Sequence, residues 1–389
     1  MAKASAQWLT DPLLARMHGA IRAAGPIRSI SVDLTTVCNL RCTGCYFFAE
    51  GMDRAAEPSD LGAFVASERA RGTNFVTVVG GEPSLALDRL KVLYDAFKLS
   101  VATNGTRPIP FDGFEDLPIG VAVWGDHATD SALRAAGRRS LFREALEIYR
   151  GDPRAFFYYT VAPGHAHEVD SVVDQCVANG NRVLFNFYSD VAGRGGELDH
   201  RQGFAAVRTA IERVIARHPS HILMTARLAE VISTGQLFGE RWGHASCTSI
   251  TFDHPANAAR IRNGRPFNGH FRAYATDLTT TRRCCTGVDR DCGTCFDTWQ
   301  HFSWVMLNLR RHAGSLRDFT EWLASSYLFY LINRLVDVAE GVRLLPEIHR
   351  RTAELATAGL EPREASANGS PFHPEPHYHD LGLVDPDHP

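Results

Sequence analysis

Residues 37–47 read VCNLRCTGCYF and place Cys38, Cys42 and Cys45 in one short stretch, separated by three and then two residues. Closely spaced soft thiolates are ligands for iron or zinc. No fourth cysteine or histidine follows at short spacing, so one metal position would stay open, and an open position indicates chemistry. A structural zinc knuckle is the competing interpretation.

The stretch follows the first of six short β-rich segments that alternate with helical ones. The β-rich segments are SISVDLT (29–35), NFVTVVG (74–80), LSVATN (99–104), IGVAVW (119–124), FFYYTVA (156–162) and RVLFNFY (182–188). Helices are expected over 59–71, 85–97, 131–150, 167–179 and 202–217, with an N-cap at Asp130 or Ser131 and a C-cap at Gly180. This alternation predicts an α/β fold, an open partial (β/α)6 barrel, because six βα units are too few to close a full barrel.

Polar and glycine-rich groups follow the ends of several predicted strands. Gly80–Pro83 (GGEP) follows the second strand, Asn104 the third, and Asp126 and His127 the fourth. Parallel sheets place their ligands at the carboxyl ends of the strands, so we expect one site there. The alternative is a metal-free α/β fold with accidental cysteines.

The CxxxCxxC loop together with GGEP resembles the radical S-adenosylmethionine (radical SAM) superfamily over residues 28–190. The resemblance implies a [4Fe–4S] cluster on Cys38, Cys42 and Cys45 that binds S-adenosylmethionine (SAM). One electron then cleaves SAM to methionine and a 5′-deoxyadenosyl radical. It also implies that Gly80–Pro83 receives the methionine amino group, where glycines let backbone approach the ligand closely.

One position departs from the family pattern, in which the residue before the third cysteine is commonly aromatic and helps to hold adenine. This chain has Gly44 there, so the adenine contact is expected from Tyr46. The expected cofactor-binding residues are Tyr46, Gly80, Gly81, Glu82, Pro83, Thr103, Asn104 and Asp126. For the polar residues after the third and fourth strands, capping of a loop is the alternative role.

Five further cysteines crowd into the C-terminal half: Cys247, Cys284, Cys285, Cys292 and Cys295. The CGTC turn at the end of this group places two sulfurs on one metal, and the expected group is a second, auxiliary [4Fe–4S] cluster. The segment looks like the SPASM or twitch regions of the superfamily, although its spacing departs from both. Structural zinc is the alternative. Because four ligands suffice, Cys284 or Cys285 is spare, either as a catalytic hydrogen-atom donor or as a buried free cysteine.

The length of 389 residues has room for a main domain and a smaller one. The expected divisions are an N-terminal helical segment (1–27), the radical SAM barrel (28–196), an extension with the auxiliary site (197–300), a helical segment (301–360) and a disordered tail (361–389). The tail histidines are taken as solvated, and Cys176 as a core residue of a helix.

Composition and charge indicate which kinds of partner and which cellular location to expect. The formal charge of −3 and the scattered arginines argue against nucleic acid. No apolar run reaches the ~20 residues of a membrane helix, and Met1–Thr10 lacks a secretory signal. We therefore expect a bacterial, cytoplasmic enzyme with a small-molecule substrate and an electron donor of the flavodoxin or ferredoxin type.

Three functional hypotheses follow from these patterns. The first is radical chemistry on a sugar, nucleoside, amino acid or isoprenoid in the biosynthesis of a specialised metabolite such as an antibiotic, by hydrogen abstraction or by radical addition. The second is modification of a ribosomally made peptide, which is disfavoured because only 37 residues precede Cys38, too few for a leader-binding domain. The same short segment has no room for a cobalamin domain, which argues against cobalamin-dependent methyl transfer. The third is a non-catalytic metal-binding or redox-sensing protein, against which the pairing of GGEP with an open three-cysteine site argues.

Overall fold

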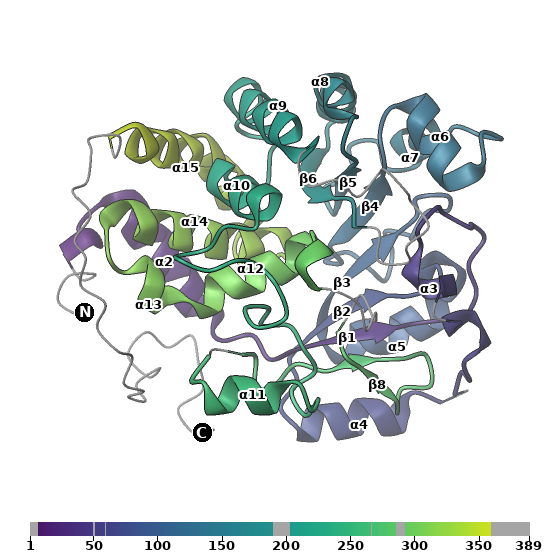
Figure 1. Ribbon diagram of the computed structural model, residues 1–389. Helices are drawn as coiled ribbons and strands as arrows, with labels where there is room; N and C mark the ends of the chain where they lie inside the picture. The colour runs from purple at the N-terminus through teal and green to yellow at the C-terminus, as the bar shows by residue number, and fades with distance from the viewer. Residues whose placement is uncertain are drawn as a thin grey trace.

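The computed structural model describes residues 7–49, 51–58, 60–189, 203–265, 267–284 and 292–358. Six parallel strands lie side by side in chain order (Figure 1): β1 (Ser29–Asp33), β2 (Phe75–Val79), β3 (Lys98–Thr103), β4 (Ile119–Val123), β5 (Ala155–Val161) and β6 (Arg182–Phe187). Two short strands extend the sheet beyond β1: β7 (Ala273–Tyr274), parallel to β1, and β8 (Thr281–Arg282), antiparallel to β7. Among the strands of the described ranges, β6 and β8 are the edges, so the sheet is open and the predicted partial barrel is confirmed.

The helices follow the strands and then continue past them as a C-terminal group. They are α2 (Pro12–Ala24), α3 (Tyr46–Ala49), α4 (Gly62–Ala70), α5 (Leu87–Ala96), α6 (His127–Ala135), α7 (Leu141–Ile148), α8 (Val169–Ala178), α9 (Phe204–Arg217), α10 (Ala226–Thr234), α11 (Asn257–Arg262), α12 (Thr298–Leu307), α13 (Leu309–His312), α14 (Leu316–Ile332) and α15 (Val338–Ala358). Helix α2 packs against α14 (Figure 1), and ion pairs join it to α15: Arg16 with Glu340 at 2.7 Å, and Arg351 with the N-cap Asp11 at 3.1 Å.

The two faces of the sheet differ in burial. After the first residue of each strand, the half-exposed positions of β2–β6 are Thr77, Val79, Ala102, Ala122, Tyr158 and Asn186, and Trp124 directly after β4 is half-exposed as well. The strand register puts all of them on one face, since Thr77 pairs with Ser100, Ala102 with Gly120, Ala122 with Tyr158 and Thr160 with Asn186. The other face is buried under helices, and we call the half-exposed one the open face.

The region predicted as one helix over 131–150 is two helices, α6 and α7, and that prediction is wrong. Ala136 (φ 51°) and Gly137 (φ 74°) adopt the left-handed conformation, which ends α6. The N-cap is also earlier than expected, because the Asp126 carboxylate accepts from the amides of Ala128 and Thr129. Asp130 lies inside α6 instead. The C-cap of α8 is Asn179, one residue earlier than predicted, and Gly180 (φ 84°) follows it in the left-handed conformation.

One continuous apolar core joins the sheet to the C-terminal helices. Cys176 is fully buried in it, as predicted, and burial raises the pKa of its thiol far above the ordinary value. Within the described ranges, no helix has both the length and the apolarity to cross a membrane. The predicted division into segments stays a prediction, and the tail 361–389 lies outside the described residues.

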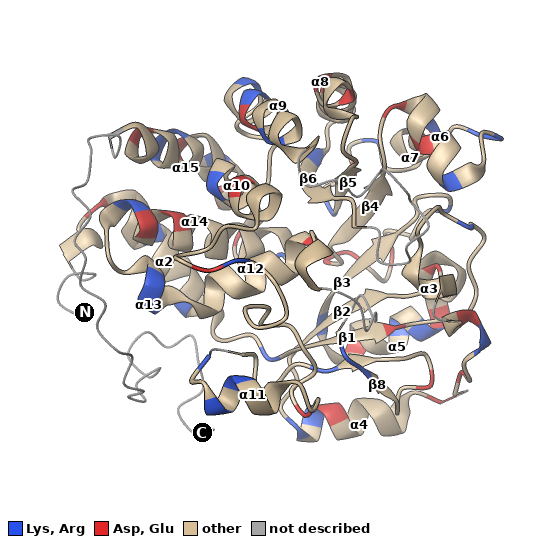
Figure 2. Ribbon diagram, in the orientation of Figure 1, with Lys and Arg blue, Asp and Glu red and all other residues tan. Residues whose placement is uncertain are grey.

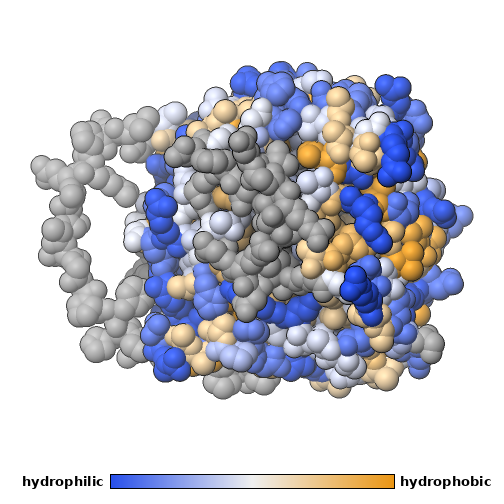
Figure 3. Space-filling model, turned by 45° about the vertical axis from the view of Figure 1, so that its right-hand side comes forward, coloured by the Kyte–Doolittle hydropathy of each residue, from blue (hydrophilic) through white to orange (hydrophobic). Residues whose placement is uncertain are grey.

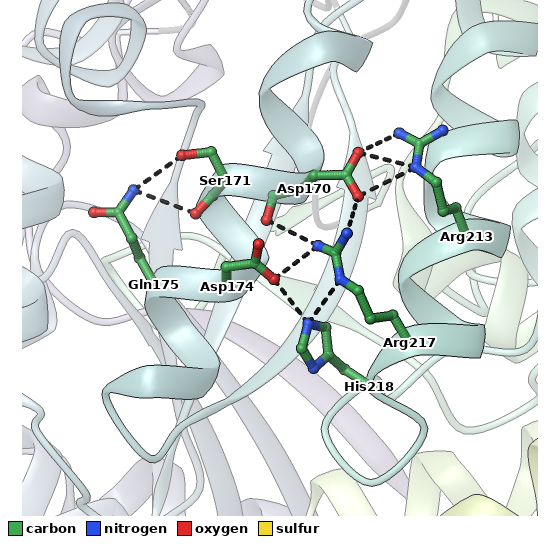
Figure 4. A network of polar contacts seen from close by, with 7 residues as sticks. All are labelled: Asp170, Ser171, Asp174, Gln175, Arg213, Arg217 and His218. Carbon is green, nitrogen blue, oxygen red and sulfur yellow. Dashed lines mark hydrogen bonds and ion pairs between the residues drawn. The ribbon is translucent and has the colours of Figure 1, made fainter.

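Figure 2 shows charged residues on many of the helices, among them α8 and α9, and on several connecting loops. Figure 4 shows one network of them, between α8 and α9. Asp170 accepts hydrogen bonds from the guanidinium groups of Arg213 and Arg217. Asp174 accepts from Arg217 and from His218, in both cases at 2.7 Å. These pairs are exposed, so each adds little stability alone, but together they hold α9 in position on α8.

Candidate functional site

Cys38, Cys42 and Cys45 lie on the loop between β1 and α3, at the carboxyl end of the sheet. All three are partly exposed. Burial raises the pKa of each thiol, to about 11 for Cys42. A neighbouring thiolate raises each pKa further: Cys42 raises the pKa of Cys38, Cys45 raises the pKa of Cys42, and Cys38 raises the pKa of Cys45. The three sulfurs therefore lie near one another on this loop. A metal centre would displace their protons, because the thiolate is the ligand.

The donor set fits an iron–sulfur cluster. In the part of the chain that the structure describes, no three His, Cys, Asp or Glu side chains converge as they would around one ion. A four-iron cluster needs less convergence, since each thiolate binds a different iron atom. Three soft thiolates on one partly exposed loop match that requirement.

The backbone conformation of Gly44 explains why this position departs from the family pattern. Its φ of 71° lies in the left-handed region, which an aromatic residue adopts only with strain. Tyr46 begins α3, and its hydroxyl donates to the Asp33 carboxylate at 3.4 Å. The predicted adenine contact from Tyr46 stays a prediction.

The glycines of GGEP let two loops meet. A Cβ on Gly80 (φ 77°) would lie 2.3 Å from Asp33 Oδ1, and a Cβ on Gly81 (φ 57°) would lie 2.3 Å from the Thr35 carbonyl oxygen. Both contacts are far too short for any side chain. The amide of Glu82 then donates to the Val37 carbonyl at 2.8 Å, which ties GGEP to the residue before Cys38.

Glu82 is buried and its carboxylate joins the ends of β2 and β3. Oε1 accepts from the Thr103 hydroxyl at 2.6 Å and from the Ser84 amide at 2.9 Å, and Oε2 accepts from the Asn104 amide at 2.6 Å. The structure thus brings together three of the predicted cofactor-binding residues. Pro83, the fourth residue of GGEP, is buried at the start of a 3₁₀ turn. The carboxylate of Glu82 positions the site, while direct contact of these residues with SAM stays a prediction.

Asn104 connects the third strand to the cysteine loop. Its Nδ2 donates to Asn39 Oδ1 at 2.8 Å, and Asn39 Nδ2 donates in turn to the Thr106 hydroxyl at 2.9 Å. Asn39 directly follows Cys38. The carboxyl ends of β1, β2 and β3 are therefore held to one another by side-chain hydrogen bonds.

Asp126 and His127 are engaged in local structure at the end of β4. Asp126 caps α6, and the ring nitrogens of His127 lie 3.1 Å from the Ser140 hydroxyl and 2.8 Å from Gln175 Oε1. Asp126 thus has the capping role that was the alternative to cofactor binding. Its role in cofactor binding stays a prediction.

Sequence reasoning missed two ion pairs at the site. Asp33, at the end of β1, is fully buried and pairs with Arg282 of β8 at 2.7 Å. Arg134 and Asp130 of α6 are both buried and pair at 2.9 Å. The alternation of SISVD signals that Asp33 shares the face of Ser31, but no local pattern identifies Arg282 as its partner.

The second cysteine group is also brought together in space. Burial raises the pKa of Cys247 to about 12, and the charges of Cys284 and Cys292 raise it further. Burial likewise raises the pKa of Cys295, to which the charges of Cys247 and Cys284 contribute. Four predicted ligands therefore lie in one neighbourhood. Cys285 lies outside the described residues.

Cations surround this second group. The Arg283 guanidinium donates to Cys292 Sγ at 2.7 Å. Arg260 is 2% exposed, and the charges of Cys247 and Cys292 act on it. Positive charge at this spot offsets the charge of thiolates, which are the form that binds metal.

Apolar side chains are exposed beside the first site. Val37, the neighbour of Cys38, is 55% exposed, and the Arg41 guanidinium lies 3.5 Å from the ring centre of the partly buried Phe48. Figure 3 brings the right-hand side of Figure 1 forward and shows apolar residues gathered there. The cysteine loop thus borders an apolar surface.

Comparison with known proteins places this site in a family. Residues 32–150 match the Radical SAM superfamily. Over 98 residues the chain is 29% identical to the probable GTP 3′,8-cyclase of Thermoplasma volcanium, a match that covers 23% of this chain and 29% of the cyclase. The matched segment is thus less than a third of that relative's length.

Two solved structures are similar at a greater distance. Streptococcus suis SuiB bound to the precursor peptide SuiA has 17% identity and a TM-score of 0.40, over 52% of this chain and 48% of SuiB. Native anSMEcpe with bound AdoMet and a peptide has 15% identity and a TM-score of 0.47, over 76% of this chain and 84% of that one.

The family match runs from β1 to the end of α7 and contains both the cysteine loop and GGEP. Members of the family use a [4Fe–4S] cluster and SAM, and the three thiols with the glycine turn beside them fit that pair. Residues 32–150 therefore form a radical SAM superfamily domain, and both motifs lie inside it.

Proposed function

We propose that the protein cleaves SAM reductively and uses the 5′-deoxyadenosyl radical on a small molecule held against the open face of the sheet. The observation that carries the proposal is the position of Cys38, Cys42, Cys45 and Gly80–Pro83 at the carboxyl end of that face. The cluster would supply one electron, from a flavodoxin- or ferredoxin-type donor, and a place for the SAM amino and carboxylate groups. The S–C5′ bond breaks to leave methionine, and the radical then takes a hydrogen atom from the substrate or adds to it.

The open face favours an uncharged substrate. Trp124 lies edge-on to Tyr188 with ring centres 5.6 Å apart, and Tyr158 lies 6.0 Å from Trp299 of α12. Asn186 adds an amide, and its Oδ1 accepts from the Thr298 amide at 3.0 Å. Aromatic side chains with one amide suit the apolar faces and hydroxyls of a sugar, a nucleoside or an isoprenoid better than they suit a charged molecule.

The main test measures 5′-deoxyadenosine by mass spectrometry after anaerobic reconstitution with iron and sulfide and reduction by dithionite in the presence of SAM. The wild type should form it, and Cys38→Ala should not. Cys176→Ala is the matched control, since that thiol is buried in the core away from the loop. Formation of 5′-deoxyadenosine by Cys38→Ala at the wild-type rate would refute the proposal.

A ribosomally made peptide is the alternative substrate, and protease treatment separates the two. Low-molecular-mass extract of the source cells should stimulate 5′-deoxyadenosine formation, and protease digestion of the extract should leave that stimulation intact. Stimulation that digestion abolishes would favour the peptide.

We also propose that Cys247, Cys284, Cys292 and Cys295 hold an auxiliary [4Fe–4S] cluster with four protein ligands. The mutual effects of these thiols on one another's pKa and the nearby Arg283 and Arg260 support it. Four thiolates leave no iron for the substrate, so the cluster would relay electrons or stabilise the fold. With Cys284 as a ligand, a hydrogen-donating role would fall to Cys285.

A further inference from the structure

Arg134 is a buried cation with fixed orientation. The residue is 2% exposed, and its guanidinium donates to the Asn104 carbonyl at 2.6 Å and to the Ala122 carbonyl at 2.7 Å. It pairs with Asp130, which is fully buried, at 2.9 Å. A planar guanidinium with these partners on β3, β4 and α6 cannot turn away without breaking several bonds.

Asp130 is held as firmly as its partner. The same Oδ1 atom that pairs with Arg134 accepts from the Trp124 amide at 2.7 Å. Buried ion pairs contribute little net stability, because desolvation offsets the attraction between the charges. A pair of this kind is therefore a candidate for a role other than stability.

The guanidinium of Arg134 faces the middle ligand of the cysteine loop. It hydrogen-bonds the Cys42 thiol. The backbones on either side are joined as well, since the amide of Thr43 donates to the Leu133 carbonyl at 2.8 Å. Leu40, Ala135 and Leu141 form a small apolar cluster on which Cys38 and Cys42 pack. The whole contact between α6 and the loop is thus fixed.

Arg41 is the natural comparison, because it also lies in the loop region. Its side chain is 65% exposed and stacks on Phe48. Water screens a charge at such a position, whereas a charge buried next to a sulfur acts through a medium of low dielectric. Arg134 is therefore the cation with the larger effect on Cys42.

We propose that Arg134 is a positioning residue that raises the reduction potential of the SAM-binding cluster. Reduction adds one electron to the cluster, and its sulfur ligands share the added negative charge. A fixed cation and a hydrogen bond at a ligand sulfur stabilise that reduced state, as hydrogen bonds to sulfurs and net charge do in iron–sulfur proteins generally. Asp130 holds the guanidinium in place. The negative charge of Asp130 lowers the reduction potential, but it acts on Cys42 less strongly than the charge of Arg134 does, so it cancels only part of the increase.

The test is an EPR-monitored redox titration of reconstituted protein without SAM, which needs no turnover. To avoid leaving an unpaired buried carboxylate, Asp130→Asn and Arg134→Gln are combined in one variant. We expect this variant to bind iron and its first cluster to be at least tenfold harder to reduce, a shift of about 59 mV toward negative potential for one electron. Arg134→Lys, which keeps the charge, should recover most of the shift.

A matched control lies before β5, where Arg154 and Asp152 form another largely buried pair at 2.7 Å. Asp152→Asn with Arg154→Gln should lower stability but leave the potential unchanged. A wild-type potential in the Asp130→Asn/Arg134→Gln variant would overturn the proposal, as would a Lys variant that is as hard to reduce as the Gln one. A double variant that loses the first cluster would also overturn it and show that the pair only shapes the loop.

Discussion

Glu82→Gln is the sharpest probe of how the site is built. The substitution keeps the shape and Oε1, so the Thr103 hydroxyl and the Ser84 amide keep their acceptor. It turns Oε2 into an NH₂ group that faces the amide of Asn104, now 2.6 Å from a donor instead of an acceptor. One charge-assisted hydrogen bond is lost, and the amide of Asn104, at a partly buried position, is left without this acceptor.

The magnitude follows from those two losses. A hydrogen bond to a charged group contributes about 1.5–3 kcal/mol, and an unsatisfied buried donor costs about 1–3 kcal/mol. The two figures overlap in what they count, so we expect the free energy of unfolding to fall by about 2–4 kcal/mol. The ends of β2 and β3 also separate, and the affinity for SAM should fall with them.

Urea denaturation of the protein without cofactors measures the first effect, and calorimetric titration of the reconstituted protein with SAM measures the second. Glu115→Gln is the control, because Glu115 also accepts a backbone amide, that of Gly113 at 2.7 Å, but at an exposed position. It should change neither quantity. A Glu82→Gln protein as stable as the wild type, with the same affinity for SAM, would refute the reasoning.

Three further predictions concern the clusters and the α8–α9 network. Reconstituted wild type should hold about eight irons, and Cys38→Ala about half of them, as iron analysis would show; an unchanged count would contradict two four-iron sites. Cys292→Ala should lose the second cluster and turnover but keep some uncoupled cleavage of SAM, whereas zinc found there in metal analysis would show that site to be structural. The hydrogen bond from Arg213 lowers the pKa of Asp170, so the stability from this pair is present above the unfolded pKa and lost as pH falls through the folded one. Arg213→Ala should therefore be less stable than wild type near neutral pH, and the two urea midpoints should converge below about pH 4; a gap that persists in acid would mean the charge pair is not its cause.

The six main strands and the cysteine loop could be predicted because their signals are local. Each strand is a run of β-branched and aromatic residues, and the spacing of Cys38, Cys42 and Cys45 lies within a few residues. By contrast, β7 and β8 are two residues long, and nothing in so short a segment distinguishes a strand from a loop. Their positions depend on pairing with β1, a contact between residues far apart in the chain.

The N-cap of α6 shows why a helix start predicted from a few neighbouring residues can be wrong. Asp followed by Ser before an apolar stretch is a good N-cap signal, but Asp126 offered another one four residues earlier. The helix begins at the earlier cap, so Asp130 lies inside it and pairs with Arg134, one turn later, next to Cys42. A spacing of i to i+4 is ordinary on exposed helices, so the pair carried no signal of burial.

The C-terminal extension reaches both cysteine groups through neighbouring residues. Arg282 of β8 pairs with Asp33 beneath the first loop, and Arg283, the next residue, donates to Cys292 in the second group. Successive side chains of an extended chain point in opposite directions, so one short segment can contact two centres at once. Cys284 follows directly and belongs to the second group. A change in the charge or ligation of that group therefore acts on a backbone whose preceding residue is ion-paired with Asp33, so β8 joins the two sites through an ion pair on one side and a hydrogen bond on the other.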